Sequence, residues 1–187
     1  MKSSSAIMYM VFSAVAFSLM STVVKYVTDF SSYQIVFFRT IGTMLFTVPL
    51  IFKKKLPMLG NHKKWLLLRA VAGVVSLTCF FESLTYLDLG TAVSLRYTSP
   101  IFATILALLF LREKIKGIQW FLFLIAFVGV LIIKGFHAEM NSIGLILVLT
   151  SAFFLGIVFV VLRKIGDAEH PLVVINYFMV IAFVFGG

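Results

Sequence analysis

Long unbroken runs of apolar residues are the feature of this sequence that most restricts its fold. The run from Ala6 to Val24 holds no charged residue, and similar runs with few charges recur along most of the chain. These runs do not alternate between apolar and polar residues, as the strands of a membrane barrel do. A soluble domain is about half apolar and about a quarter charged, whereas this chain is 61% hydrophobic and 12% charged. The sequence therefore predicts an all-α integral membrane protein, because only helices and closed barrels satisfy every backbone hydrogen-bonding group in lipid.

A membrane crossing needs about 20 apolar residues in a helix, and this length locates the spans. We expect a transmembrane helix bundle with six complete spans, at residues 6–27, 31–52, 66–87, 90–111, 117–134 and 141–162. A partial seventh span begins at Pro171, a residue type that is favoured at the first turn of a helix. The chain stops at Gly187 before this helix is long enough to cross. We therefore expect the C-terminus to be cut.

The positions of the basic residues predict how the chain is oriented. A net charge of +9 would suggest a nucleic-acid partner in a soluble protein, but here the Lys and Arg residues follow the expected loops, and we expect no nucleic-acid partner. Only Lys25 and Lys134 fall on one side of the expected bundle, whereas the other side carries Lys2, Lys53, Lys54, Lys55, Lys63, Lys64, Arg69, Arg112, Lys114, Lys116, Arg163 and Lys164. The positive-inside rule then predicts a cytoplasmic N-terminus in the inner membrane of the cell, and we interpret these basic runs as solvated topology signals.

A weak internal repeat predicts two related halves. When the sequence is shifted by 138 residues, Ser13 falls on Ser151, Lys25 on Arg163, and Asp29 on Asp167. An odd repeat unit of five helices forces the second copy to enter the membrane from the opposite side, which is the inverted-repeat architecture of many transporters. We expect a first repeat at 1–135 and the start of a second at 141–187; chance similarity between apolar segments is the alternative.

Three short motifs carry a resemblance to a known family. They are the stretch from Leu84 to Ala92, the stretch from Tyr97 to Phe102, and Leu111-Arg112-Glu113-Lys114 followed by Trp120 to Val130. In order and spacing, residues 6–135 resemble the EamA-type domain of the drug/metabolite transporter superfamily, and residues 141–187 resemble the start of a second such domain. This resemblance implies ten transmembrane helices in two inverted repeats, and transport of small organic solutes such as amino acids, nucleotide derivatives or vitamins.

Four ionisable residues lie inside the expected spans and are the first candidates for a site. They are Lys25, Arg39, Glu82 and Arg96, and Glu82 and Arg96 depart from the small, apolar or aromatic residues of many family members. Each costs a few kcal/mol at the bilayer centre unless it faces the bundle interior. Their expected depths are similar, so their positive balance predicts an anionic or zwitterionic solute. An ion pair of Glu82 with Arg39 or Arg96 is the alternative, and a proton-carrying role for Glu82 is left open. Lys25 is expected to extend to the membrane interface.

Pro100 adds a candidate backbone feature close to Arg96 in the sequence. A proline cannot donate a hydrogen bond to the carbonyl four residues earlier, which belongs to Arg96. We expect a kink there, with the freed carbonyl beside the Arg96 side chain, and Tyr97 as a neutral hydrogen-bonding group nearby. A plain packing kink is the alternative.

These observations favour a multi-pass transporter that moves a small organic metabolite across the cytoplasmic membrane by alternating access. Its expected partners are the solute and the lipid bilayer, and the question whether it forms a homo-oligomer is left open. A non-transporting membrane subunit or an inactive truncated remnant is the alternative. A membrane-embedded enzyme is less favoured, because the chain lacks a pair of His residues at helical spacing and a glycine-rich phosphate loop. We expect no cofactor and no metal, and the single cysteine, Cys79, has no partner in the chain.

Overall fold

Every regular element that the structure describes is a helix. The computed structural model describes residues 3–26, 30–57, 60–111 and 141–186, together with residues 118, 121, 125, 128 and 129. The helices are α1 (Ser3–Tyr26), α2 (Ser32–Lys53), α3 (Lys63–Tyr86), α4 (Leu89–Arg96), α5 (Ser99–Leu106), the π-helix η1 (Ala107–Leu111), α7 (Ser142–Ile165), the 3-10 helix η2 (Gly166–Ala168) and α8 (Pro171–Gly186). The predicted all-α fold is confirmed for these segments.

Five helical segments of the described chain are long and apolar enough to cross a membrane. They are Ile7–Tyr26 within α1, the helices α2, α3 and α7, and the segment Leu89–Leu111 that joins α4, α5 and η1. Each agrees with a predicted span to within three residues at either end. The apolar segment Pro171–Phe185 is shorter than these five. The predicted span at 117–134 lies outside the described residues, so the full number of spans stays a prediction.

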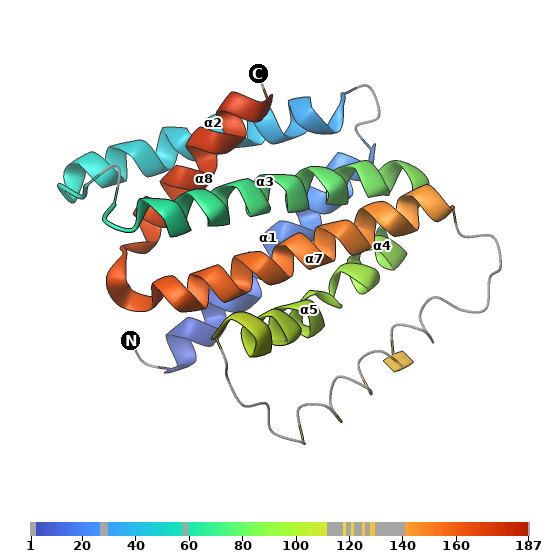
Figure 1. Ribbon diagram of the computed structural model, residues 1–187. Helices are drawn as coiled ribbons and strands as arrows, with labels where there is room; N and C mark the ends of the chain where they lie inside the picture. The colour runs from blue at the N-terminus through green and yellow to red at the C-terminus, as the bar shows by residue number, and fades with distance from the viewer. Residues whose placement is uncertain are drawn as a thin grey trace.

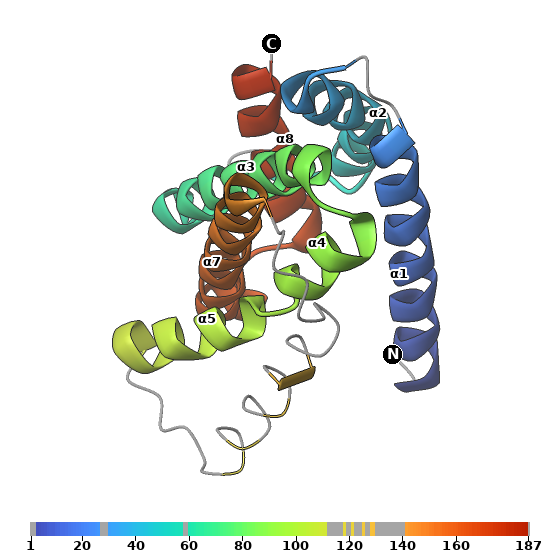
Figure 2. The ribbon, with the colours of Figure 1, turned by 90° about the vertical axis from the view of Figure 1, so that its right-hand side faces the viewer.

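Helix α3 lies in the middle of the bundle. Helices α2 and α8 pack along one side of it, and α7 with α4 and α5 lies on the other side (Figures 1 and 2). Helices α3 and α7 run antiparallel, since the start of α7 at Gly144 lies against Leu87 just after α3. At the middle of this pair the Ser76 hydroxyl donates to the Ser151 carbonyl at 2.9 Å, and the Ser151 hydroxyl donates to the Ser76 carbonyl at 2.7 Å.

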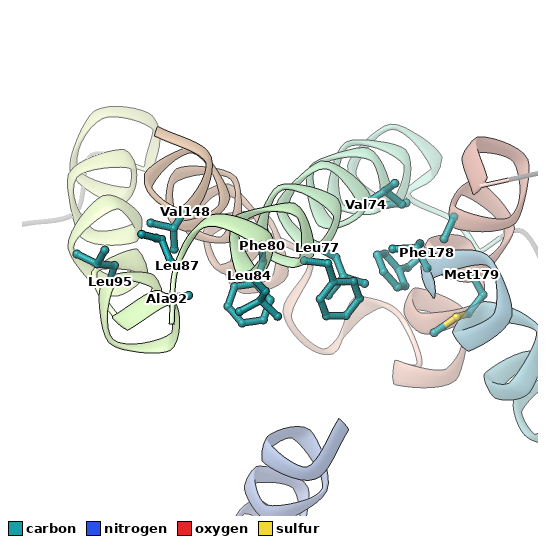
Figure 3. Packing of buried hydrophobic residues seen from close by; sticks show 14 residues of the cluster. Val74, Leu77, Phe80, Leu84, Leu87, Ala92, Leu95, Val148, Phe178 and Met179 are labelled. Atoms are coloured by element: carbon teal, nitrogen blue, oxygen red, sulfur yellow. The ribbon is translucent and has the colours of Figure 1, made fainter. Parts of the chain in front are cut away.

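A hydrophobic core follows α3 along its length. At its C-terminal end Leu87 and Leu95 pack near Val148, and towards its N-terminal end Val74 packs near Phe178 (Figure 3). Phe80 occupies the middle of this row and is fully buried. A second buried cluster, formed by Leu66, Val161, Ile165, Val173 and Val174, closes the N-terminal end of α3.

Helix α1 is only loosely packed against this core. It stands at the edge of the bundle in Figure 2, and its apolar side chains are largely exposed, with Met10 at 72% and Phe12 at 75%. Its contacts concentrate near its C-terminal half, where Ser21 is buried and the Phe17 ring stacks on Phe80 at 6.2 Å. Such an apolar surface is suited to lipid rather than to water.

The predicted irregularity near Pro100 is confirmed as a break in the helix. α4 ends at Arg96, Tyr97 and Thr98 form a turn, and α5 begins at Ser99. The Thr98 carbonyl accepts the Ile101 N–H at 2.9 Å, so α5 starts a new hydrogen-bonding series just after the break. Proline is favoured in the first turn of a helix, and this explains why the break precedes Pro100 instead of centring on it.

Candidate functional site

Arg96 is the most unusual charged residue of the bundle interior. It is the last residue of α4, and its guanidinium lies over the Phe80 ring at 4.2 Å and near the Phe17 ring at 5.6 Å. Its Nε and Nη1 atoms are buried and have no hydrogen-bond partner among the residues that the structure describes. Cation–π contacts offset part of the cost of burying this charge, but the two N–H groups still lack an acceptor.

Arg39 lies on α2 and brings a second positive charge to the same region. Repulsion from the Arg39 charge acts on the Arg96 guanidinium, and the Arg39 side chain is half-buried. Neither arginine has a carboxylate oxygen within 4.0 Å in the part of the chain that the structure describes. The ion pair between Glu82 and one of these arginines, left open by the sequence, is therefore not formed.

Glu82 is held by a neutral partner instead. The Ser32 hydroxyl, in the first turn of α2, donates a hydrogen bond to Glu82 Oε2 at 2.7 Å. Ser32 is buried and Glu82 is half-buried. This bond joins the start of α2 to the last turns of α3.

Lys25 binds the C-terminal end of α3. Its Nζ donates to the carbonyl of Leu84 and, at 2.9 Å, to the carbonyl of Leu87. The last carbonyls of a helix have no partner within the helix and carry the negative end of its dipole, so a cation is favoured there. The predicted extension of Lys25 to the membrane interface stays a prediction.

Tyr97 and Pro100 lie apart from this group. The Tyr97 side chain is 73% exposed, and Pro100 is also exposed. These two residues affect the course of the backbone, because the turn that begins at Tyr97 ends α4 just after Arg96. Repulsion from Arg39 acts on Arg96, Glu82 is hydrogen-bonded to Ser32, and Lys25 is hydrogen-bonded to the end of α3. That these residues share one site stays a prediction.

Arg69 was interpreted from the sequence as a solvated basic residue, and this was wrong. It lies in the second turn of α3, with its guanidinium 5.0 Å from the centre of the Phe178 ring and with Nε and Nη1 buried and unpartnered. Asn176 on α8 is 4% exposed, and its Oδ1 also lacks a partner. The four apolar residues from Trp65 to Leu68, directly before Arg69, were the available signal that it lies inside a helix.

A cavity of about 560 Å³ lies elsewhere, between α3, α5 and α7. Its walls are apolar, including Leu68, Leu106 and Phe153, and Lys164 lies at its edge. None of the charged residues around Arg96 lines it. Among the described residues there is also no group of three His, Cys, Asp or Glu side chains that could hold a metal ion.

Comparison with known proteins relates the chain to membrane transporters. Residues 4–135 match the sequence profile of the EamA-like transporter family. The Pseudopaline exporter CntI of Pseudomonas aeruginosa strain PAO1 is 29% identical over 181 residues, covering 95% of this chain and 63% of the exporter. Solute carrier family 35 member G1 of Homo sapiens is 26% identical over 191 residues, covering 94% of this chain and 52% of the carrier.

A riboflavin transporter of Vibrio cholerae is 29% identical over 118 residues, covering 63% of this chain and 40% of the transporter. The chain therefore spans less than two thirds of the length of each of these curated relatives. No solved structure matches it.

Proposed function

Because the chain belongs to the EamA-like transporter family, we propose that it is part of a multi-pass membrane transporter that moves a small organic solute by alternating access. The names of two relatives, a pseudopaline exporter and a riboflavin transporter, support a small organic molecule as the transported class. In this proposal the protein is not an enzyme, needs no cofactor, and has the solute and the lipid bilayer as its partners.

The observation that carries the proposal is the unpaired guanidinium of Arg96. A charge buried inside a membrane bundle is costly unless an opposite charge or hydrogen bonds compensate it, and such residues commonly mark a transport pathway. Arg96 Nε and Nη1 have no acceptor, and Arg39 adds further positive charge. An anionic or zwitterionic solute supplies the missing acceptor, so we assign Arg96 to the solute's anionic group and Arg39 to the surrounding positive potential.

Glu82 has a separate role in this proposal. Its carboxylate accepts a hydrogen bond from Ser32, so it is placed to exchange a proton with the solute pathway without being neutralised by an arginine. If Glu82 carries a proton during transport, Glu82→Gln will change the pH dependence of uptake. An unchanged pH dependence in a folded Glu82→Gln protein would limit Glu82 to a structural role.

The topology of the proposal follows the distribution of basic residues. The N-terminus is cytoplasmic, the membrane is the inner membrane, and residues 1–135 and 141–187 belong to two inverted repeats. Single cysteines in place of Lys54 and Asp88, both exposed, test this orientation in intact cells. A membrane-impermeant maleimide should label the cysteine at 88 and not the one at 54, and the reverse pattern contradicts the N-in orientation.

The substrate class is tested with the full chain reconstituted in proteoliposomes. A panel of labelled metabolites sorted by charge, with riboflavin as its uncharged member, is assayed for uptake by the wild type, Arg96→Gln and Lys54→Gln. Loss of a charge-assisted contact should weaken the apparent affinity for anionic or zwitterionic members about 10- to 100-fold in Arg96→Gln. The exposed Lys54 is the matched control and should leave uptake unchanged.

Two results would contradict the proposal. Wild-type uptake by a well-folded Arg96→Gln protein would show that Arg96 does not bind the solute. Preference for uncharged or cationic solutes would show that the predicted substrate class is wrong. Absence of uptake for the whole panel favours the non-transporting subunit.

A further inference from the structure

The carboxylate of Glu169 joins two segments that lie far apart in the sequence. Glu169 follows η2, just before α8, and its Oε1 accepts hydrogen bonds from the backbone N–H groups of Asn61 and, at 2.7 Å, of His62. His62 Nδ1 lies 3.3 Å from the same oxygen. The Glu169 side chain is 2% exposed, so this is a buried acidic group placed against the N-terminus of α3.

The backbone at Gly60 is shaped to admit this carboxylate. Gly60 has a φ of +53°, and a Cβ there would lie 2.9 Å from Glu169 Oε2 and 2.7 Å from Leu66 Cδ1. Both the conformation and the space thus require glycine. Both the Glu169 side chain and the backbone that starts at Gly60 are therefore shaped for this contact.

Burial and hydrogen bonding act in opposite directions on this group. Burial raises the pKa of Glu169, whereas the N–H groups of His62 and Asn61 and the His62 side chain lower it, and the net pKa lies below the ordinary value of 4.5. The carboxylate is therefore charged at neutral pH, and its hydrogen bonds are of the stronger, charge-assisted kind.

The contact covers the second apolar cluster. Leu66 of α3, Val161 and Ile165 of α7, and Val173 of α8 are each at most 5% exposed directly behind it. The contact also links a segment inside the family match, residues 60–62, to a segment beyond it. The hydrogen bonds therefore fix the N-terminal end of α3 to the start of α8.

From this geometry we infer that Glu169 is a positioning residue that holds the N-terminal end of α3 closed, and that release of its carboxylate from Asn61 and His62 opens this end during transport. The inference rests on the proposed alternating access. It assigns to Glu169 the contact that must break when the bundle opens on this side.

The test measures access to two matched buried positions in the full chain, reconstituted in lipid nanodiscs that expose both membrane faces. Val173 lies behind the Glu169 contact and Val148 lies near the opposite end of the bundle, and both are 0% exposed. Each is replaced by cysteine in a Cys79→Ala background. The rate of labelling by a charged maleimide is then compared between Glu169 and Glu169→Gln proteins. Asp88→Asn, which removes an exposed carboxylate that makes no capping hydrogen bond to α4, is the control.

Glu169→Gln should raise the labelling rate at 173 about 10- to 100-fold and leave the rate at 148 unchanged. Gly60→Ala, which displaces the carboxylate from the other side, should act in the same direction. Asp88→Asn should change neither rate. Because labelling needs no solute, a protein that fails to transport still reports on this contact.

An unchanged rate at 173 in a folded Glu169→Gln protein would overturn the inference, even if uptake assays support transport. A parallel rise at 173 and 148 would also overturn it, since that pattern means general loss of stability rather than opening at one end.

Discussion

A methyl group added at Gly156 tests how closely α5 and α7 pack. A Cβ at this position would lie 2.9 Å from the backbone nitrogen of Ala103 and 2.9 Å from Phe102 Cβ. Both atoms belong to the rigid part of α5, so the whole helix must shift to admit the methyl group. Overpacking of this kind costs about 1 to 3 kcal/mol, and close helix contacts in membranes depend on such small residues.

Gly42 on α2 supplies the matched control. It also lies inside a helix, but nothing lies within 4 Å of a Cβ built there. Alanine in a helix interior is more favourable than glycine by about 0.5 to 1 kcal/mol, and both variants share this gain. The free energy of unfolding should therefore rise slightly in Gly42→Ala, and it should be about 1 to 3 kcal/mol lower in Gly156→Ala than in Gly42→Ala.

The assay is reversible unfolding of the purified chain in mixed micelles by titration with sodium dodecyl sulfate, followed by circular dichroism. A third variant, Gly144→Ala, gives an intermediate case. Its Cβ would meet Leu87 Cγ at 2.7 Å, which moves when that side chain rotates, and Tyr86 Cβ at 2.8 Å, which the backbone holds in place. Equal stability of Gly156→Ala and Gly42→Ala would refute the close packing of α5 on α7.

Three further outcomes follow from contacts described above. Lys25→Met should lower the free energy of unfolding by about 1 to 3 kcal/mol, because two carbonyls at the end of α3 lose their donor; a neutral result in the same titration would contradict the capping role. Ser76→Ala and Ser151→Ala should show a coupling energy of about 0.6 kcal/mol in a double-mutant cycle, and strict additivity would argue against their reciprocal bonds. Because the pKa of Glu169 is lowered on folding, its stabilisation should be present above pH 4.5 and lost as the pH falls below it, and Glu169→Gln should reduce this dependence in unfolding titrations at a series of pH values.

The positions of the helices could be predicted because they depend on local properties of the chain. The length of each apolar run sets the length of its span, and the turn at Asp88 separates α3 from α4. Pro100 likewise predicted a helix irregularity, which the structure shows two to three residues earlier at Tyr97 and Thr98. In each case the determining residues lie within a few positions of the feature that they produce.

The partners of the charged residues could not be predicted, because they come from distant helices. Lys25 bonds to carbonyls about 60 residues later in the chain, at separations of 59 and 62. The apolar residues before Arg69 indicate that it lies inside a helix, but only the packing of α8 places Phe178 over its guanidinium. Arg39 and Arg96 were predicted to share a region, but the choice of Ser32 over an arginine as the partner of Glu82 depends on how α2 and α3 cross.

The separation between Glu169 and Asn61 has a consequence for the order in which the protein is assembled. The two residues are 108 positions apart, and a ribosome adds about 5 to 20 residues per second. The N-terminal amides of α3 therefore wait on the order of 5 to 20 s for the side chain that caps them. During that interval we expect the first helices to be in the membrane already, with the end of α3 still uncapped. This end of the bundle can close only after α7 and the start of α8 have been synthesised.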